Sequence, residues 1–309
     1  MAVEAISTFN TPPQPRRQRL LEDERWLAFM LLVPTVVLLG LFIAYPFVRG
    51  ILLSVSNSRV GVAGDFVGFA NYYKIWHDSI FRTAVYNTIL YTAVTTVFKL
   101  GLGLWLALLL NRDFRGKAFT RAFILLPFII PTVLSTFAWR WMFDPTFSVI
   151  NWTLYHLGAI SGRINWLGDP DLAMISIIVV NIWRGVPFFA ISLLAGLQTI
   201  SPELNEAAAI DGAKPWQRFW HITWPLLLPV TMVVMLFSVI QTLADFQIVY
   251  VMTGGGPANA THLFATYAYQ IGVGTGLLSE GAAIALAMFP VLLLIVVIQL
   301  LYIRRVETR

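Results

Sequence analysis

Two groups of polar side chains lie within otherwise apolar segments of the chain, and their types suit the binding of a solute. The first group falls at helical positions i, i+3, i+4 and i+7 and so shares one helix face: Asn181, Arg184, Gly185 and Phe188. The second group shares a face of a later segment: Ser238, Gln241, Thr242 and Asp245. Together they offer hydrogen-bond donors, acceptors and an aromatic ring, which a hydroxyl-rich solute needs. We predict that these residues line a substrate pocket.

The charges of this pocket admit two interpretations. Arg184 lies in the middle of its segment, where a charge costs roughly 3 kcal/mol on the insertion scale and marks a functional site by default. The alternative is a structural Arg184–Asp245 ion pair that holds two helices together. Arg184 permits an anionic solute, whereas neutralisation by Asp245 leaves room for a neutral sugar. We expect changes at Asn181 and Gln241 to shift solute preference without loss of stability.

Another apolar segment carries polar residues on one face, with Tyr91 beside them: Thr88, Thr92, Thr95 and Lys99. Hydroxyl groups in membrane helices hydrogen-bond to neighbouring helices. We therefore expect this stripe to join helices rather than to contact the solute, with Lys99 either finding a partner or extending toward the inner interface. Arg140 lies close enough to the outer interface to reach water, and we assign it no function.

The elements that must position these residues are membrane-spanning helices. Of the 309 residues 58% are hydrophobic and 12% are charged, against about 25% charged residues in a soluble domain. This composition excludes an ordinary soluble enzyme and a disordered chain, and it indicates an all-α polytopic membrane protein. Six segments are apolar and long enough to cross a bilayer: 26–47, 84–110, 122–143, 172–197, 222–244 and 282–303. We predict a tail over 1–25 and a six-span domain over 26–305.

The distribution of basic residues predicts the orientation of these spans. Six spans place both termini on one side of the membrane. The tails and even-numbered loops hold thirteen Lys and Arg residues and the odd-numbered loops hold five, so the positive-inside rule places both termini in the cytoplasm. The loop 246–281 contains no Lys or Arg, which fits an outer loop. Several tryptophans near the outer end of the third span indicate an interfacial belt: Trp139, Trp141, Trp152 and Trp166.

Motifs for catalysis, metal binding and nucleotide binding are missing from the sequence. The chain has no cysteine and no GxxxxGK[ST], GxSxG or HExxH motif. The four histidines fall in four separate loops, so we expect no metal site. The basic residues follow topology and do not form a nucleic-acid patch. A membrane-embedded hydrolase or transferase would need acid and base groups converging at one depth, and we therefore expect no catalytic residue and no cofactor.

The segment 201–221, between the fourth and fifth spans, predicts two short helices. Ser201 is a candidate N-cap, Pro202 suits the first helical position and Gly212 suits the left-handed position after the helix. A second helix can begin at Pro215 and continue into the fifth span. The segment combines acidic with aromatic residues: Glu203, Glu206, Asp211, Trp216, Phe219 and Trp220. A helix lying on the negative inner leaflet explains only the aromatic half, whereas a helix that docks into another protein explains both.

Three motifs of the chain occur together in one known family. The first consists of residues at characteristic spacings: Glu206, Ala207, Ala208, Gly212, Ile222 and Pro225. In this pattern the chain resembles the EAA loop of the inner-membrane permeases of binding-protein-dependent ABC importers, with Trp224 where the family usually has leucine. Residues 181–188 (NIWRGVPF) resemble the fourth-span motif of the sugar-importing branch, and residues 253–257 (TGGGP) resemble the outer-loop motif of its MalF/UgpA-type subunits. Residues 45–46 and 68–72 resemble its first span and first outer loop, so the similarity covers nearly the whole chain beyond the tail.

The resemblance implies a type I ABC importer permease fold and a subunit that is not itself an enzyme. Such a subunit supplies half of a pathway, here for a carbohydrate or polyol-like solute, in the bacterial inner membrane. It implies three partners: a second six-span permease, an ATPase dimer that binds ATP and Mg, and an extracytoplasmic solute-binding protein. An ion-coupled secondary transporter is the alternative, for which Asp245 would be the only deep acid.

The resemblance also implies a role for the segment 201–221. In such permeases the EAA segment is a coupling helix that sits in a cleft of the ATPase and moves when ATP closes the ATPase dimer. The matching residues here are Glu206, Ala207, Ala208, Asp211 and Gly212. Glu206 would be the charged contact, and Gly212 would permit the turn between the two short helices.

Overall fold

A computed structural model describes residues 24–307, so residues 1–23 of the predicted tail lie outside the described part, as do residues 308–309. The chain divides into two compact units at residue 52. The first unit holds α2 (Glu24–Leu39), the π-helix η1 (Gly40–Ala44) and most of α3 (Tyr45–Ser54). Apolar side chains such as Leu31 and Phe42 are exposed along this helix. A helix this apolar needs lipid or protein around it.

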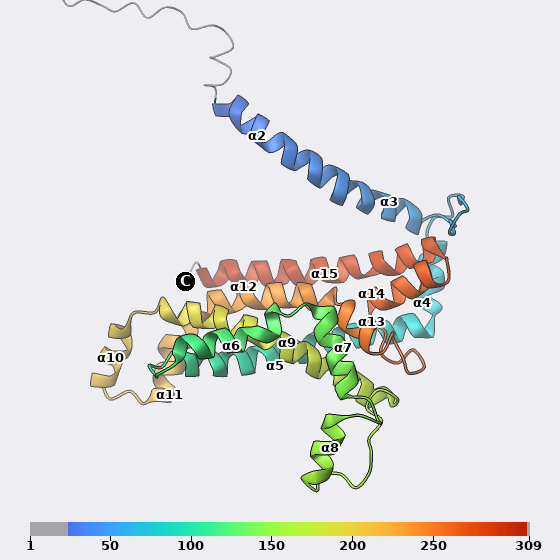
Figure 1. Cartoon of the computed structure of the whole chain (residues 1–309). Helices are drawn as coiled ribbons and strands as arrows, with labels where there is room; N and C mark the ends of the chain where they lie inside the picture. The colour runs from blue at the N-terminus through green and yellow to red at the C-terminus, as the bar shows by residue number, and fades with distance from the viewer. Residues whose placement is uncertain (1–23, 308–309) are drawn as a thin grey trace, which may run out of the picture. The chain divides into compact units, whose positions relative to one another are not determined.

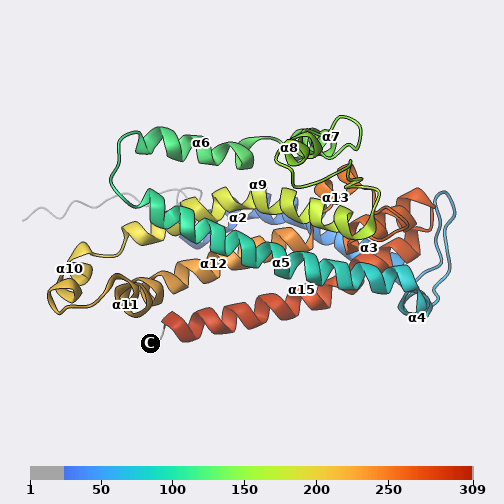
Figure 2. The same ribbon diagram turned by 90° about the horizontal axis from the view of Figure 1, so that it is seen from below.

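The second unit is a helical bundle (Figure 1). Its long helices are α5 (Ser79–Leu110), α9 (Pro170–Gln198), α12 (Trp224–Leu243) and α15 (Leu278–Glu307). Its shorter helices are α4 (Ala70–His77), α6 (Lys117–Ile129), α7 (Thr132–Met142), α8 (Val149–His156), α10 (Pro202–Ile210), α11 (Pro215–Arg218), η2 (Phe219–Thr223), α13 (Gln247–Met252), α14 (Phe264–Tyr269) and η3 (Gln270–Gly274). Helices α10 and α11 lie at one end of the bundle, the α10 end, and α4 lies at the opposite end, the α4 end (Figures 1 and 2). Apart from two isolated β-bridges in the loop 56–66, all regular structure in the described residues is helical.

Helices α5 and α9 form the centre of the bundle, side by side in Figure 2. At their contact Gly103 of α5 lies against α9, and a Cβ atom at this position would overlap the Cβ atom of Phe189. Only glycine therefore allows the two backbones to approach so closely. Helix α12 packs against both, and the core that the helices share contains buried Leu110, Leu193 and Leu227. This tight packing fixes the polar faces of α5, α9 and α12 relative to one another.

The ends of the long helices follow the local sequence. Asp78 caps α5, because its carboxylate accepts a hydrogen bond from the amide of Ile80 (2.9 Å). Asp169 caps α9 in the same way, accepting from the amides of Asp171 and Leu172 (both 3.0 Å). These caps satisfy amides that have no partner within the helix. They start α5 and α9 at the α4 end of the bundle.

The third predicted span is not one helix. Helices α6 and α7 meet at an angle of 88°, so the prediction of a continuous helix over 122–143 is wrong in its middle. Pro131 has no amide hydrogen, and it forces Ile130 before it into an extended conformation with ψ of 132°. The described residues thus contain five long apolar helices, and six spans if the bent pair counts as one.

The loop 253–263, which holds the TGGGP motif, is fastened to α5. Asn87 donates hydrogen bonds through Nδ2 to the carbonyl oxygens of Ala260 (2.7 Å) and His262 (3.2 Å). The His262 side chain is buried, and desolvation by this burial lowers the pKa of its imidazole below the ordinary value. Thr88, predicted to join helices, accepts a hydrogen bond from the amide of Phe264 (3.1 Å). These hydrogen bonds therefore fix the loop to α5 at the α4 end of the bundle.

Candidate functional site

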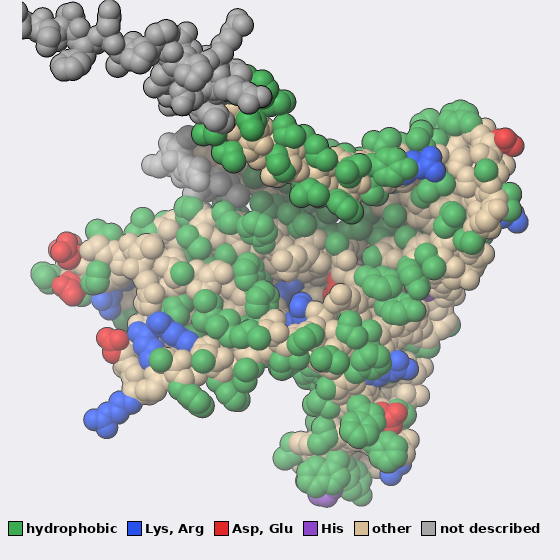
Figure 3. All heavy atoms as spheres, turned by 45° about the horizontal axis from the view of Figure 1, so that its top comes forward, with side chains coloured by type: hydrophobic (Ala, Val, Ile, Leu, Met, Phe, Trp, Pro, Cys, Tyr) green, Lys and Arg blue, Asp and Glu red, His purple; other side chains and the backbone are tan. Residues whose placement is uncertain are grey.

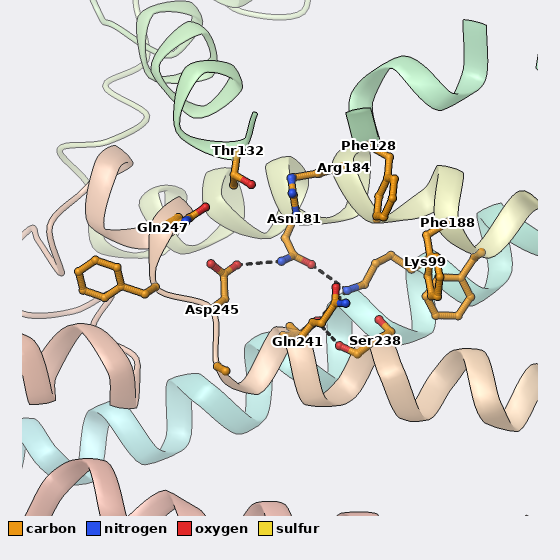
Figure 4. A pocket seen from close by; sticks show the side chains of 15 residues that line it. Lys99, Phe128, Thr132, Asn181, Arg184, Phe188, Ser238, Gln241, Asp245 and Gln247 are labelled. Atoms are coloured by element: carbon orange, nitrogen blue, oxygen red, sulfur yellow. Dashed lines mark hydrogen bonds between the residues drawn. The ribbon is translucent and has the colours of Figure 1, made fainter. Parts of the chain in front are cut away.

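All eight residues predicted to bind a solute line one cavity of about 470 Å³. The cavity lies among α5, α6, α7, α9, α12 and the turn that leads into α13 (Figure 4). Its lining also includes residues that were not predicted: Lys99, Phe128, Thr132, Phe189, Ala244, Phe246 and Gln247. Figure 3 shows hydrophobic side chains spread over the bundle, whereas many of its charged side chains gather toward the two ends.

The second group of predicted residues does not share a single helix. Three of its members lie on α12: Ser238, Gln241 and Thr242. Helix α12 ends at Leu243, so the prediction that Asp245 continues its face is wrong. The chain turns there, because the amide of Asp245 donates to the carbonyl oxygen of Thr242 (3.1 Å). Oδ1 of Asp245 accepts from the amide of Ile248 (3.3 Å), and the turn keeps the carboxylate at the edge of the cavity.

A chain of hydrogen bonds crosses the cavity wall from Lys99 to Tyr91. Nζ of Lys99 donates to Oδ1 of Asn181 and to Oγ1 of Thr242 (both 2.9 Å). Nδ2 of Asn181 donates to Oδ2 of Asp245 (3.0 Å), which also accepts from the hydroxyl of Tyr91 (2.6 Å). The network joins α5, α9 and the end of α12, and it links an ammonium to a carboxylate through one amide.

Arg184 stands outside this network. It forms no salt bridge with Asp245. Its Nε is buried without a partner, and its guanidinium makes no hydrogen bond to any residue of the described range 24–307. A direct Arg184–Asp245 ion pair is therefore absent from the described residues, because neutral donors on Tyr91 and Asn181 hold the carboxylate instead. In the view of Figure 4, Arg184 and Ser238 lie on opposite sides of the cavity.

The sequence did not mark Lys99 as a lining residue. We expected it to join helices or extend toward the interface, and it joins α9 and α12 while also facing the cavity. Lys99 is only 3% exposed. Its aliphatic chain lies over Gly185, where a Cβ atom would overlap the Cδ atom of the lysine. Gly185 thus makes room for Lys99. A charge in the middle of an apolar segment was the sequence signal that could have identified Lys99 as a lining residue.

Phe128 and Thr132 reach the cavity because the helix between them is broken. Phe128 is close to the end of α6 and Thr132 is the first residue of α7, so they flank the bend at Pro131. The ring of Phe128 stacks on that of Phe188, with the two centroids 5.9 Å apart. Pro131 was the sequence signal for this bend, because a proline disfavours the helical conformation in the residue before it.

Arg140 also has a structural role that the sequence did not show. Its Nη1 donates a hydrogen bond to the carbonyl oxygen of Val251 (3.0 Å). This bond joins α7 to α13, which pack against each other. Arg140 therefore helps to hold the bent span against the turn that carries Asp245.

The predicted coupling segment forms two short helices at the α10 end. Helix α10 ends at Ile210, and Gly212 follows in the left-handed conformation with φ of +80°. The amide of Gly212 donates to the carbonyl oxygen of Ala209 (3.1 Å), and that of Ala213 donates to Ala208 (2.9 Å). This pair of bonds is a Schellman motif, which ends a helix at a glycine. Helices α11 and η2 then lead into α12, as the sequence predicts.

The coupling segment exposes its acidic and apolar side chains. Glu206 and Asp211 are exposed, and Ile210 is 88% exposed. Nη1 of Arg218 donates to the carbonyl oxygen of Asn205 (3.3 Å), which ties α11 to α10. A helical hairpin projects from the bundle, and within the described residues its acidic side chains form no salt bridge.

The cavity offers hydrogen bonding and charge recognition. Its ionisable residues are Lys99, Arg184 and Asp245, and its other polar groups are amides and hydroxyls. Within residues 24–307 no group of three or more His, Asp or Glu side chains could hold a metal ion. The arrangement suits the non-covalent binding of a polar solute.

Similar proteins share both the sequence and the fold. Residues 99–308 match a family described as the inner membrane component of binding-protein-dependent transport systems. The sulfoquinovosyl glycerol transport system permease protein SmoG of Agrobacterium fabrum is 38% identical over 94% of each chain. The trehalose/maltose transport system permease protein MalF of Thermococcus litoralis is 34% identical over 90% of this chain and 93% of its own. A bacterial ABC transporter that imports the acidic polysaccharide alginate has the same fold, with a TM-score of 0.81 and 23% identity over 94% of this chain and 99% of that one.

Proposed function

Because the chain belongs to the family of inner membrane components of binding-protein-dependent transport systems, we propose that its cavity holds a carbohydrate or polyol-like solute during import. The chain is a membrane-embedded permease subunit of an ABC importer. Relatives that are 38% and 34% identical are named for sulfoquinovosyl glycerol and for trehalose and maltose. These names support the carbohydrate class.

One observation carries the solute part of the proposal. Two groups of residues far apart in the sequence line a single cavity. The amide of Gln241, the hydroxyl of Ser238 and the ring of Phe188 are the kinds of group that bind the hydroxyls and the apolar face of a sugar. The volume of about 470 Å³ lies within the range of roughly 300–1,000 Å³ of small-molecule sites.

The coupling part of the proposal rests on the α10 end. An ATPase dimer binds the exposed segment 201–221, and Glu206 is the charged contact. The hairpin transmits force because Gly212 and Arg218 fix α10 against α11, and α11 continues into α12, whose far end carries Thr242. Movement of α10 therefore reaches the cavity through one continuous element.

The remaining partners follow from membership of the family. A second six-span permease completes the pathway in a heterodimer. An extracytoplasmic solute-binding protein delivers the solute at the α4 end, where the loop 247–281 carries no Lys or Arg. Both termini and the α10 end face the cytoplasm of a bacterial cell. ATP and Mg are bound by the partner ATPase.

Uptake of labelled carbohydrates into proteoliposomes that contain the whole importer tests this proposal. Gln241→Ala removes an exposed amide from the cavity wall, and we expect uptake at low solute concentration to fall by about fivefold, the effect of one lost hydrogen bond. Gln198→Ala, at the exposed end of α9, is the matched control and should transport like the wild type. Unchanged solute affinity and preference in Gln241→Ala would count against the cavity. Uptake that follows a proton gradient without ATP would support the secondary transporter instead.

A further inference from the structure

We propose that the imported carbohydrate carries an anionic group, such as a sulfonate, phosphate or carboxylate, and that Arg184 binds this group beside Lys99. The inference rests on the proposed function of the cavity as the solute site. The supporting observations are the charges of the side chains that line the cavity and the hydrogen bonds that these side chains form within the protein.

The cavity wall has an excess of positive charge. Its ionisable residues are two cations, Lys99 and Arg184, and one carboxylate, Asp245. Every other lining side chain is uncharged. Electrostatic attraction is stronger in a protein interior than in water, because the effective dielectric constant is lower. An anionic solute is therefore attracted into this cavity.

Asp245 does not pair directly with Arg184, because three other donors hold its oxygens. Oδ2 accepts hydrogen bonds from Tyr91 and Asn181, and Oδ1 accepts from the amide of Ile248. A carboxylate has about four acceptor positions. The negative charge is thus stabilised within the cavity wall and linked through Asn181 to Lys99.

The guanidinium of Arg184 is left for the solute. Its Nε is buried and lacks a partner, and its other nitrogens make no hydrogen bond within the described part of the chain. A guanidinium is a planar fork of donors that matches the paired oxygens of a sulfonate, phosphate or carboxylate. Lys99 uses two of its three ammonium hydrogens on Asn181 and Thr242, so one remains for the same anion.

The rest of the wall suits a sugar attached to that anion. The stacked rings of Phe128 and Phe188 form an apolar surface, and the amide of Gln241 faces the same space. A neutral sugar would fill the space but leave the arginine charge without a counter-ion. The site therefore favours a solute with one charged end and one hydroxyl-rich end.

The experiment compares matched solutes in proteoliposomes that contain the whole importer and its binding protein. The probes are a panel of glycosides, each offered as the neutral sugar, its 6-sulfonate, its 6-phosphate and its uronate. The variants are Arg184→Gln, Arg184→Lys and the control Arg112→Gln, which changes an exposed arginine outside the cavity. Thermal shift of the same complexes with each probe gives a second measurement that does not depend on transport.

We expect the wild type to take up and be stabilised by an anionic probe in preference to its neutral partner. Arg184→Gln should lower uptake of that probe by about tenfold or more, as the loss of a charge-assisted pair requires, and should change uptake of the neutral partner by less than about twofold. Uptake of the anionic probe by Arg184→Lys should lie between that of the wild type and that of Arg184→Gln, because lysine keeps the charge but lacks the planar fork of donors. The anionic probe that the wild type takes up best identifies the anionic group of the solute as a sulfonate, a phosphate or a carboxylate.

Two other results have separate meanings. One result is that the wild type prefers neutral sugars and that Arg184→Gln and Arg184→Lys change uptake of neutral and anionic probes equally. This result would overturn the anionic inference and leave the proposed function intact. Uptake of no carbohydrate in the panel by an importer that hydrolyses ATP would overturn the carbohydrate assignment itself.

Discussion

At the scale of single residues, Asn181 holds the charged part of the cavity together. Its carbonyl oxygen accepts from Lys99 and its amide nitrogen donates to Asp245. The sequence suggested that a change at Asn181 would alter solute preference alone. The structure argues otherwise, because loss of this amide removes one hydrogen bond from the buried ammonium of Lys99 and one from the carboxylate of Asp245. Gln241 makes no such structural bond among the described residues, so an effect of its replacement on solute preference alone remains a prediction.

Replacing Tyr91 by phenylalanine should destabilise the protein through this same network. The change removes the hydroxyl that donates to Asp245 at 2.6 Å and keeps the buried ring. We expect the free energy of unfolding to fall by about 1–2 kcal/mol, because a buried acceptor loses a donor. Thermal unfolding of the purified complex measures the effect. Tyr86→Phe on the exposed side of α5 is the control, and equal melting temperatures for both variants would contradict the role of Tyr91.

Reversing the charge of Glu206 should uncouple the importer. Glu206→Lys should leave the bundle intact because the side chain is exposed and forms no salt bridge within the described residues. At a docked interface we expect the reversal to cost about 2–5 kcal/mol of binding free energy. Co-purification of the ATPase and ATP-dependent uptake should both be lost. Asp113→Lys, an exposed acid outside the segment 201–221, should retain both, and normal uptake by Glu206→Lys would remove Glu206 from the coupling contact.

At the scale of the elements, prolines have different effects in different helices. Pro187 and Pro229 lie inside α9 and α12 without ending them. Pro131 instead separates α6 from α7 by 88°, and the bend brings Phe128 and Thr132 to the cavity. Hydrophobicity and length locate all these segments equally well, so they do not tell a kink from a break. The difference depends on packing: α9 is held in the centre of the bundle, whereas α7 packs against α13.

The contact between α5 and α9 can be tested with two glycines on one helix. A Cβ atom at Gly103 would overlap Phe189, whereas a Cβ atom at Gly101 meets nothing within 4 Å. We expect Gly103→Ala to lower stability by about 1–3 kcal/mol, as overpacking does. Gly101→Ala should be neutral or slightly stabilising because alanine favours a helix. Equal melting temperatures of the two variants would show that α5 and α9 can move apart without a loss of stability.

The sequence predicts the site better than it predicts the connections. Helical spacing brings Asn181, Arg184 and Phe188 to one face, and the structure places that face on the cavity. Spacing does not reveal that Asp245 lies past the end of α12, because a turn bonded through Thr242 decides its position. It also does not pair Lys99 with Asn181, which is 82 residues away. Long-range pairs of this kind depend on the packing of α5 against α9.

At the scale of the whole molecule, the two ends of the bundle differ in structure. The α10 end presents an exposed acidic hairpin, and the α4 end presents loops fastened by Asn87. The cavity lies between them. The two ends communicate through helices that run the length of the bundle, chiefly α5, α9 and α12. An importer driven by ATP needs such a division, because energy and solute enter from opposite sides.

The orientation of the two ends can be measured with single cysteines, since the native chain has none. Ile210 and Ala258 are both exposed, one at each end of the bundle. We expect a membrane-impermeant thiol reagent to label Ala258→Cys in intact cells, and to label Ile210→Cys only after the cytoplasm is opened. The positive-inside distribution is the physical reason. The opposite pattern would invert the topology.

The hydrogen bonds of Lys99 have a consequence for how the protein is made. Helix α5 leaves the ribosome before its partners exist, because Asn181 lies 82 residues later and Thr242 lies 143 residues later. A lysine at the centre of an inserting helix costs about 2.5–3.5 kcal/mol. The hydrogen bonds to Asn181 and Thr242 cannot yet offset this cost, because neither residue has been synthesised. The apolar remainder of α5 must therefore carry the charge into the membrane. The cavity acquires its final electrostatics only when α9 and α12 arrive, so the order of synthesis is also the order in which the site matures.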